Sequence, residues 1–141
     1  SILAMVKGLE DYNPENLRSS LNKKTELFDQ LKLKYDSFQE TPTGIMVKEG
    51  DMYNELHCEN KDLTAKDFNF LWSMILLKKE GIITIPAVGM PGASATIRFD
   101  IASPDSNKLT VEEIIKKINS SINSLKNVMN NTDKCYNLIF E

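Results

Sequence analysis

The sequence predicts one α+β domain, built from helices and a β-hairpin, and three observations lead to this class. Apolar residues recur at spacings of three and four in several segments, which is typical of amphipathic helices. Helix-capping residues stand at the start of these segments. After Gly81 the period changes to the alternation of a β-strand. A chain of 141 residues supports one domain with a proper core. We therefore expect a single domain over 1–141, with its core at about 13–101 and an extension at 108–141.

A helix of about 25 residues is predicted from Asn13 to Phe38. Asparagine at the cap, proline at the first position and glutamate in the first turn favour this start. Pro42 would end the helix, because the residue before a proline is pushed out of the helical region. The apolar stripe of this helix is interrupted once, at Lys24, and comprises Leu17, Leu21, Phe28, Leu31, Tyr35 and Phe38.

Two short elements and a central helix follow. Thr43–Val47 is β-prone and predicts a brief strand, and Met52–Cys58 predicts a compact helix. Thr64 is a good N-cap for the central helix, and Asp67 stands where a capping box has its acid. Gly81 can take the left-handed conformation that ends helices.

A β-hairpin is predicted after the central helix, with strands at Ile82–Val88 and Ser94–Ile101. Ile82–Val88 is a β-prone run, and Ser94–Ile101 alternates apolar and polar residues, which fits a strand that buries one face. The Gly-Met-Pro-Gly sequence between them is typical of a turn. Pro86 cannot donate to a ladder, so the first strand is expected at a sheet edge or at a bulge.

The C-terminal extension is predicted to hold a helix over Thr110–Asn130 and a short strand over Cys135–Phe140. Thr110 and Glu113 form a capping box at the start of that helix. Its apolar stripe alternates spacings of four and three, which is also the spacing of a coiled-coil seam. The stripe comprises Val111, Ile115, Ile118, Ile122, Leu125 and Met129.

Composition and charge disfavour several classes of function. The formal net charge is −3 and the isoelectric point about 5.3, whereas a nucleic-acid binder usually carries a basic stripe. The longest apolar run, Met74–Leu77, is far shorter than the roughly 20 residues that span a bilayer, so no membrane partner is expected. Ser1–Met5 lacks the charged leader of a secretion signal. Cys58 and Cys135 indicate free thiols in a reducing compartment, with one disulfide as the alternative.

Catalytic, metal and cofactor sites are not expected, and an enzyme is not predicted. His57, Cys58 and Cys135 offer at most three soft ligands, whereas a closed zinc site needs four. Adjacent helical residues point about 100° apart, which is a poor geometry for a Cys–His nucleophilic pair. The glycines of Gly89–Gly92 lie in a predicted hairpin turn and not between a strand and a helix, so they do not form a phosphate loop.

The order helix, short strand, helix, turn, helix and β-hairpin predicts a variant winged helix-turn-helix. It has a three-helix core plus a β-hairpin wing, with an added C-terminal helix and a short terminal strand. Leu63–Ile83, with its leucine-rich helix and Gly-Ile-Ile run, and the alternating strand Ile97–Ile101 resemble the C-terminal winged-helix domain of origin-recognition and replication-initiator ATPases. The resemblance covers Met46–Ile101 and rests on pattern more than on invariant residues. The acidic, Asn- and Lys-rich character looks most like the silencing branch of that family in budding yeast.

This resemblance implies a non-catalytic module of a heterochromatin protein that acts in gene silencing, in the nucleus, on chromatin and at telomeres. The implied partners are a second copy, as a homodimer, and other silencing proteins. Nucleosomes would be reached only through the full-length protein. The alternative is a DNA-binding winged helix of a replication-initiator-like or transcription-regulator protein.

Direct DNA binding is disfavoured by the central helix, which is apolar almost all round. Asp67 would repel phosphates, and the wing at Val88–Ala95 has no Lys or Arg, which departs from the basic wing of the family. A helix that is apolar on more than one face must be covered on more than one side, so a partner surface is expected there. In the DNA-binding alternative, the contacts would be Lys66, Asn69, Lys78, Lys79 and Arg98.

Self-association would use the stripe of the last helix or the terminal strand. The stripe can also pack within its own domain, and the strand can join its own wing or a partner's sheet edge. The residues expected in the interface are Ile115, Ile118, Ile122 and Leu125, with Tyr136, Leu138 and Phe140 as a second surface.

Overall fold

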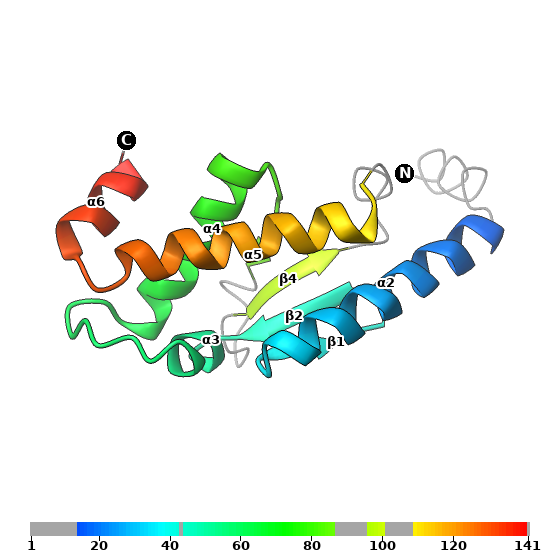
Figure 1. Cartoon of the computed structure of the whole chain (residues 1–141), viewed down its shortest axis with the longest axis horizontal. Helices are drawn as coiled ribbons and strands as arrows, with labels where there is room; N and C mark the ends of the chain where they lie inside the picture. Colours follow the sequence, from blue (N-terminus) through cyan, green and yellow to red (C-terminus); the bar gives the residue numbers. More distant parts are fainter. Residues whose placement is uncertain (1–13, 43, 87–95, 101–108, 141) are drawn as a thin grey trace, which may run out of the picture.

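The computed structural model describes residues 14–42, 44–86, 96–100 and 109–140. These ranges contain five α-helices and four β-strands, which confirms the α+β class. Within them, no helix combines the length and the apolar character needed to cross a bilayer. The elements are α2 (Pro14–Lys34), β1 (Phe38–Glu40), β2 (Gly44–Lys48), α3 (Asp51–Glu55), α4 (Ala65–Glu80), β3 (Ile85–Pro86), β4 (Thr96–Asp100), α5 (Val111–Val128) and α6 (Thr132–Phe140) (Figure 1).

The four strands form one antiparallel sheet in the order β1-β2-β4-β3. Over 45–48 of β2 and 97–99 of β4, buried side chains alternate with less buried ones, as expected where one face of a sheet is covered. Phe38 on β1 pairs with Val47 on β2, which pairs with Ile97 on β4, and all three side chains are buried. Ile45 and Phe99 are buried on the same face. The apolar core of the molecule lies against this face.

Helix α5 packs along α4 and α2 (Figure 1). Trp72 of α4 is fully buried and stands edge-on to Phe99 of β4, with ring centroids 6.0 Å apart. The Trp72 indole Nε1 donates to Ser121 Oγ on α5 at 3.0 Å, and Ser121 Oγ donates to the Ile118 carbonyl at 2.6 Å. The polar atom of the buried indole is therefore satisfied, as is usual for buried tryptophan.

The predicted caps of α4 and α5 are confirmed. Thr64 Oγ1 accepts from the Asp67 N–H at 3.1 Å, and Thr110 Oγ1 accepts from the Glu113 N–H at 3.1 Å. Gly81 ends α4 in the left-handed conformation, with a φ of 67°. A residue with a Cβ rarely adopts that conformation, so glycine is suited to this helix end.

The predicted hairpin corresponds to β3 and β4, which pair in antiparallel orientation. Strand β3 lies at the edge of the sheet, as predicted. This position suits Pro86, which has no N–H to donate to a further strand. The predicted turn at 89–93 lies outside the described residues.

The first helix is shorter than predicted. It ends at Lys34, and Phe38 instead begins strand β1. The N–H and the hydroxyl of Ser37 both donate to the Glu55 carboxylate, at 2.8 and 2.6 Å, which fixes an extended turn between the two elements. The three-residue spacing from Tyr35 to Phe38 fits a helix, but pairing with β2 buries Phe38 equally well, and this tertiary contact decides the outcome.

The compact helix is also shorter than predicted, because α3 spans Asp51–Glu55. His57 has a φ of 53°, a left-handed conformation that cannot continue a right-handed helix. The loop that follows is held to the end of α5, where Asn60 Nδ2 donates to the Met129 carbonyl at 3.0 Å.

The terminal segment is a helix and not the predicted strand. Helix α6 begins after Asn131, whose Oδ1 accepts from the Lys134 N–H at 3.1 Å and whose carbonyl accepts from the Cys135 N–H at 3.0 Å. Asparagine is among the best capping residues, and this cap overrides the β-prone composition. The strand predicted over Cys135–Phe140 is therefore not formed.

Candidate functional site

The interface residues predicted on α5 lie in the core of their own chain. Ile118, Ile122 and Leu125 are fully buried, and Ile115 is partly buried at the margin of the same cluster. This is the own-domain packing that the sequence left open as an alternative. A side chain buried inside one domain cannot also line a surface between two folded domains. Association through this stripe would require the domain to open. Self-association through another surface stays a prediction.

Tyr136 is the part of the predicted second surface whose side chain the structure describes, and it is 61% exposed on α6. Leu138 and Phe140 belong to the same helix, and their side chains lie outside the described part. Because the segment is helical, it does not present the extended backbone that adds a strand to a sheet edge.

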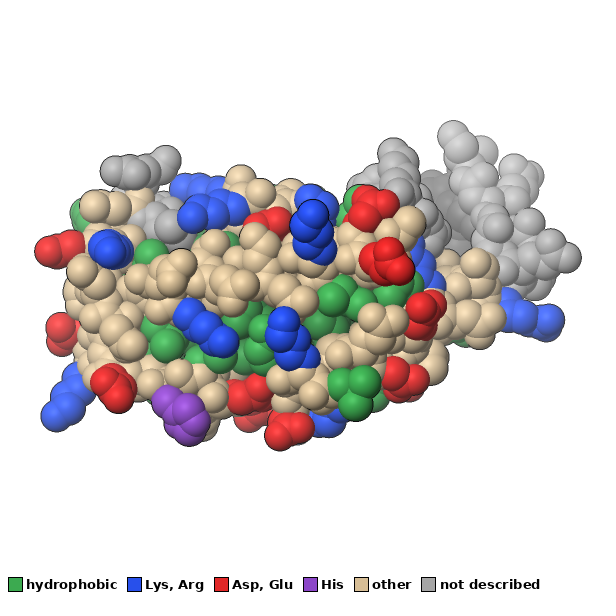
Figure 2. All heavy atoms as spheres, in the orientation of Figure 1, with side chains coloured by type: hydrophobic (Ala, Val, Ile, Leu, Met, Phe, Trp, Pro, Cys, Tyr) green, Lys and Arg blue, Asp and Glu red, His purple; other side chains and the backbone are tan. Residues whose placement is uncertain are grey.

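The alternative DNA contacts do not share one surface. Asn69 is 6% exposed and therefore buried in α4. Lys66 is exposed in the first turn of α4, Lys78 and Lys79 are exposed in its last turn, and Arg98 is exposed on β4. On the face shown in Figure 2, basic and acidic side chains are interspersed. That face has no continuous basic stripe of the kind that follows a phosphate backbone.

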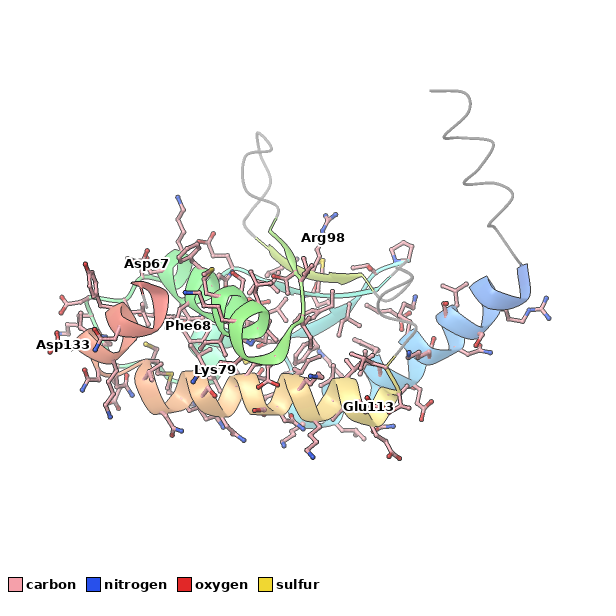
Figure 3. All side chains as sticks on the ribbon, turned by 90° about the horizontal axis from the view of Figure 1, so that it is seen from above. Asp67, Phe68, Lys79, Arg98, Glu113 and Asp133 are labelled. Carbon is pink, nitrogen blue, oxygen red and sulfur yellow. The ribbon has the colours of Figure 1, made fainter. Side chains whose placement is uncertain are left out.

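The second face of the sheet is less covered than the core face, and we call it the open face. It carries Gln39, Met46 and Arg98, which pair across β1, β2 and β4. Gln39 and Met46 are half-buried and Arg98 is exposed. Figure 3 shows Arg98 pointing away from α5. Arg98 was predicted only as a DNA contact, although its place between two apolar residues of an alternating strand already sets it opposite the core.

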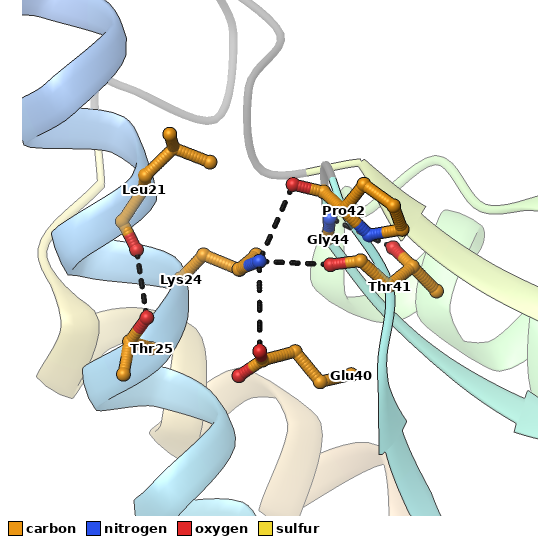
Figure 4. A network of polar contacts seen from close by, with 7 residues as sticks. All are labelled: Leu21, Lys24, Thr25, Glu40, Thr41, Pro42 and Gly44. Atoms are coloured by element: carbon orange, nitrogen blue, oxygen red, sulfur yellow. Dashed lines mark hydrogen bonds and ion pairs between the residues drawn. The ribbon is translucent and has the colours of Figure 1, made fainter.

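Lys24, the interruption in the apolar stripe of α2, is a buried structural lysine (Figure 4). Its Nζ donates to the carbonyls of Thr41 and Pro42 at 2.8 and 3.3 Å, and it lies 3.8 Å from Glu40 Oε1. The same turn is closed by the Gly44 N–H, which donates to Thr41 Oγ1 at 2.9 Å. A buried ammonium requires such partners. Lys24 therefore joins α2 to the turn between β1 and β2.

A shallow groove of about 570 Å³ lies along the solvent side of α5, next to Gln30 of α2. Amide and hydroxyl side chains such as Asn119, Ser120 and Asn123 form much of its lining. Asn119 Oδ1 is buried there, with no hydrogen-bond donor among the described residues. The lining also holds Glu112 and Lys116, but no hydrogen bond among the described residues joins either of them to a serine hydroxyl of the groove.

The two cysteines lie near the junction of α5 and α6, and both are free thiols. Burial, and then the neighbouring Cys58, raises the pKa of the Cys135 thiol, whose Sγ donates to the Val128 carbonyl at 2.9 Å. A raised pKa lowers the fraction of thiolate, which is the form that attacks and binds metals. Within the described ranges, His, Cys, Asp and Glu form no group of three suited to a metal ion.

Comparison with known proteins places the chain in a family. A family model described as the UPF0425 C-terminal domain matches residues 34–110, which is more than half of the sequence. A UPF0425 pyridoxal phosphate-dependent protein of Methanosphaera stadtmanae is 41% identical over 134 residues, covering 94% of this chain and 35% of the relative.

Two further relatives carry the same description. The protein of Methanothermobacter thermautotrophicus is 33% identical over 138 residues, covering 98% of this chain and 35% of the relative. The protein of Methanococcus maripaludis is 34% identical over 127 residues, covering 87% of this chain and 30% of the relative. The chain spans about a third of the length of the curated relatives it matches.

These matches overturn the resemblance to origin-recognition and replication-initiator ATPases. The relatives are archaeal, and archaea have no nucleus, so the predicted location in the nucleus, on chromatin and at telomeres is wrong. The silencing function and the DNA-binding initiator alternative are also wrong, because the relatives are described as UPF0425 pyridoxal phosphate-dependent proteins. The prediction that the chain is not an enzyme is contradicted as well, because the relatives are described as pyridoxal phosphate-dependent, which indicates an enzyme-related family. A leucine-rich helix followed by a hairpin reflects general packing of helices on a sheet and does not identify a family.

Proposed function

The chain belongs to the UPF0425 family, as its C-terminal domain, and from this premise we propose that it is the C-terminal part of a pyridoxal phosphate-dependent protein. In this proposal the open face of the sheet packs against the part that holds the cofactor. Arg98 would then contact an anionic group at the junction. The relatives' descriptions and the one-third share of their length support the proposal.

The described residues do not fit the cofactor by themselves. Proteins hold pyridoxal phosphate through a Schiff base to a lysine, with an acidic or basic partner at the pyridine nitrogen. Lys24 is the buried lysine of the described ranges, and its ammonium is already bound by the carbonyls of Thr41 and Pro42 and lies near Glu40. We therefore place the cofactor's lysine in the two thirds of the relatives that this chain does not cover.

The observation that carries the proposal is the exposed guanidinium at the centre of the open face. Arg98 lies on an inner strand, with Met46 and Gln39 in register beside it. A planar guanidinium is the side chain best suited to bind a carboxylate or phosphate through two parallel hydrogen bonds. The half-buried side chains beside it offer a partly apolar surface for packing.

Cofactor retention tests the division of labour. The 141-residue chain and the full-length Methanosphaera stadtmanae relative are each incubated with pyridoxal phosphate, gel-filtered, and reduced with borohydride before peptide mapping. We expect the relative to retain about one cofactor per chain on one lysine, and the isolated chain to retain no stoichiometric cofactor. A single stoichiometric lysine adduct on the isolated chain would contradict the proposal.

Binding in trans tests the open face. The N-terminal two thirds of the same relative, produced separately, is titrated with the 141-residue chain by calorimetry. We expect Arg98→Gln to weaken binding about tenfold, since a desolvated charged contact is worth more than 1.4 kcal/mol. Arg18→Gln is the matched control, because Arg18 is the other arginine of the sequence and is exposed on α2. Equal effects of the two variants would contradict a role for the open face.

The finer fold assignment is also a proposal, and we infer a variant winged-helix arrangement. Helices α2, α3 and α4 precede the β3–β4 pair, and β2 lies beside β4 in the sheet order β1-β2-β4-β3, which supports it. Strand β1 and helices α5 and α6 are additions to that plan. An experimental structure in which residues 87–95 do not form the loop of a hairpin would contradict it.

A further inference from the structure

The outer side of α4 exposes large apolar side chains. Phe70 is 53% exposed and Leu77 is 48% exposed, and the half-buried Met74 lies between them. Their spacings of four and three place all three on one side of the helix. We call Phe70, Met74 and Leu77 the outer stripe.

The inner side of the same helix is already committed to the core. Phe68, Trp72 and Ile75 are buried against the sheet and the neighbouring helices. Helix α4 is therefore apolar on two opposite sides, and the described part of the chain covers one of them. An exposed apolar side on an otherwise polar surface is typical of an interaction site.

We propose that the outer stripe pairs with the outer stripe of a second copy, with the two α4 helices antiparallel about a two-fold axis near Ser73 and Met74. In this register, Phe70 of one copy lies opposite the partner's Leu77. Lys66, at the beginning of α4, then lies near the partner's Glu80, at its end. Both residues flank the stripe on the same edge of the helix, because they are fourteen positions apart, close to four full turns.

The charges fit this orientation. Antiparallel pairing places Lys66 beside the partner's Glu80 twice, once at each end, as a two-fold interface requires. This self-complementarity of sequence favours a second copy over an unrelated partner.

The proposed dimer is separate from the junction with the cofactor-bearing part, because that junction uses the open face of the sheet. The outer stripe is on α4 and Arg98 is on β4, and Figure 3 shows Arg98 projecting from the sheet, away from the α4–α5 pair. The inference therefore goes beyond the proposed function, and either can fail alone.

The size of the surface sets the expected strength. A helix of 16 residues is about 24 Å long. Two such helices bury less than the roughly 800 Å² per partner of a standard interface. We therefore expect a reversible dimer that forms at micromolar or higher concentration, and not an obligate one.

Sedimentation equilibrium of the 141-residue chain over a wide concentration range tests the pairing. The wild-type mass should rise from 16.0 kDa toward twice that value. Phe70→Asp should raise the dimer Kd more than tenfold while the circular dichroism spectrum is unchanged. Leu33→Asp is the matched control, because Leu33 is 90% exposed on α2, and it should leave the dimer Kd unchanged.

Charge reversal tests the antiparallel register. Glu80→Lys alone should raise the dimer Kd about threefold to tenfold, as expected when two exposed ion pairs become repulsive. Adding Lys66→Glu in the same chain should restore the wild-type Kd. A double variant as weak as the single variant would overturn the register and with it the proposal.

Two further outcomes would overturn the proposed dimer. A wild-type chain that stays at 16.0 kDa at every concentration would overturn the proposal. If Phe70→Asp leaves the mass unchanged but weakens binding to the N-terminal two thirds of the relative, the outer stripe belongs to that junction, and the dimer is overturned.

Discussion

Helices α4 and α5 pack against each other, but only α5 is completed by its own domain. The apolar side of α5, with Ile118 and Ile122, is buried, and its other side is polar and faces solvent. Helix α4 buries one apolar side and exposes another, with Phe70 and Leu77. The fold alone explains the apolar residues of α5, whereas α4 carries more apolar residues than its packing in the fold requires.

The buried polar groups of the two helices are satisfied to different degrees. Ser121 of α5 is fully buried and bonded on both sides, to Trp72 Nε1 and to the Ile118 carbonyl. Asn69 of α4 is buried, and neither its Oδ1 nor its Nδ2 has a hydrogen-bond partner in the described part of the chain. On α5, the Oδ1 of the half-buried Asn119 also lacks a donor there. Unpaired buried amides cost stability, and on α4 both amide atoms of one side chain are unpaired.

The largest expected effect separates the inner core from the outer stripe. Ile118→Ala should lower the free energy of unfolding by about 2–5 kcal/mol, because it opens a cavity in the core. Phe70→Ala should change it by less than about 0.5 kcal/mol in dilute, monomeric solution. Urea unfolding followed by circular dichroism measures both. Equal losses would mean that the outer side of α4 is covered within one chain, which would remove the contrast between the helices.

An intermediate effect concerns the buried polar groups. Ser121→Ala should lower the free energy of unfolding by about 1–2 kcal/mol, because it leaves Trp72 Nε1 without an acceptor. Asn69→Leu should raise it by about 1 kcal/mol, since it removes unpaired amide atoms. The same urea titrations measure both changes.

Asn127→Leu is the matched control for Asn69→Leu, because Asn127 is exposed on α5. It reports the gain from helix propensity alone, a few tenths of a kcal/mol. A gain no larger for Asn69→Leu than for Asn127→Leu would show that the buried amide is hydrated or otherwise satisfied.

The smallest expected effect tests where the two helices are alike. Thr64→Ala and Thr110→Ala should each lower the free energy of unfolding by about 1 kcal/mol, because each removes the acceptor of one helix-start N–H. The two caps have equal hydrogen-bond lengths, so we expect equal losses. Thermal unfolding of the two variants and of the matching serine variants would measure this, and a loss confined to Thr110→Ala would indicate that the start of α4 is held by other contacts.

Local signals predicted the elements whose ends are set by a single residue. The caps at Thr64 and Thr110, the helix end at Gly81 and the edge position of Pro86 all follow from backbone chemistry within a few residues. Local signals failed where pairing with a segment distant in the sequence determines the secondary structure. Strand β1 depends on pairing with β2, which the helical spacing of Phe38 conceals.

The candidate site could be predicted less well than the fold. The exposure of Arg98 depends on which face of the sheet the helices cover, and this is a property of packing. Lys24 could be seen as a gap in an apolar stripe, but its partners Thr41 and Pro42 lie in a turn whose position only the tertiary structure determines. The family was missed because the resemblance rested on element order, whereas membership is carried by residue identities along 94% of the chain.

The position of Trp72 has a spectroscopic consequence. It is the single tryptophan of the sequence, and it is fully buried at the point where α4, α5 and the sheet meet. Excitation selective for tryptophan therefore reports on this junction alone, and exposure of the indole to water should shift its emission to longer wavelength. Events at the outer stripe or at Arg98 should leave the emission unchanged. The chain thus carries its own fluorescent reporter, which separates loss of the core from loss of a partner in one measurement.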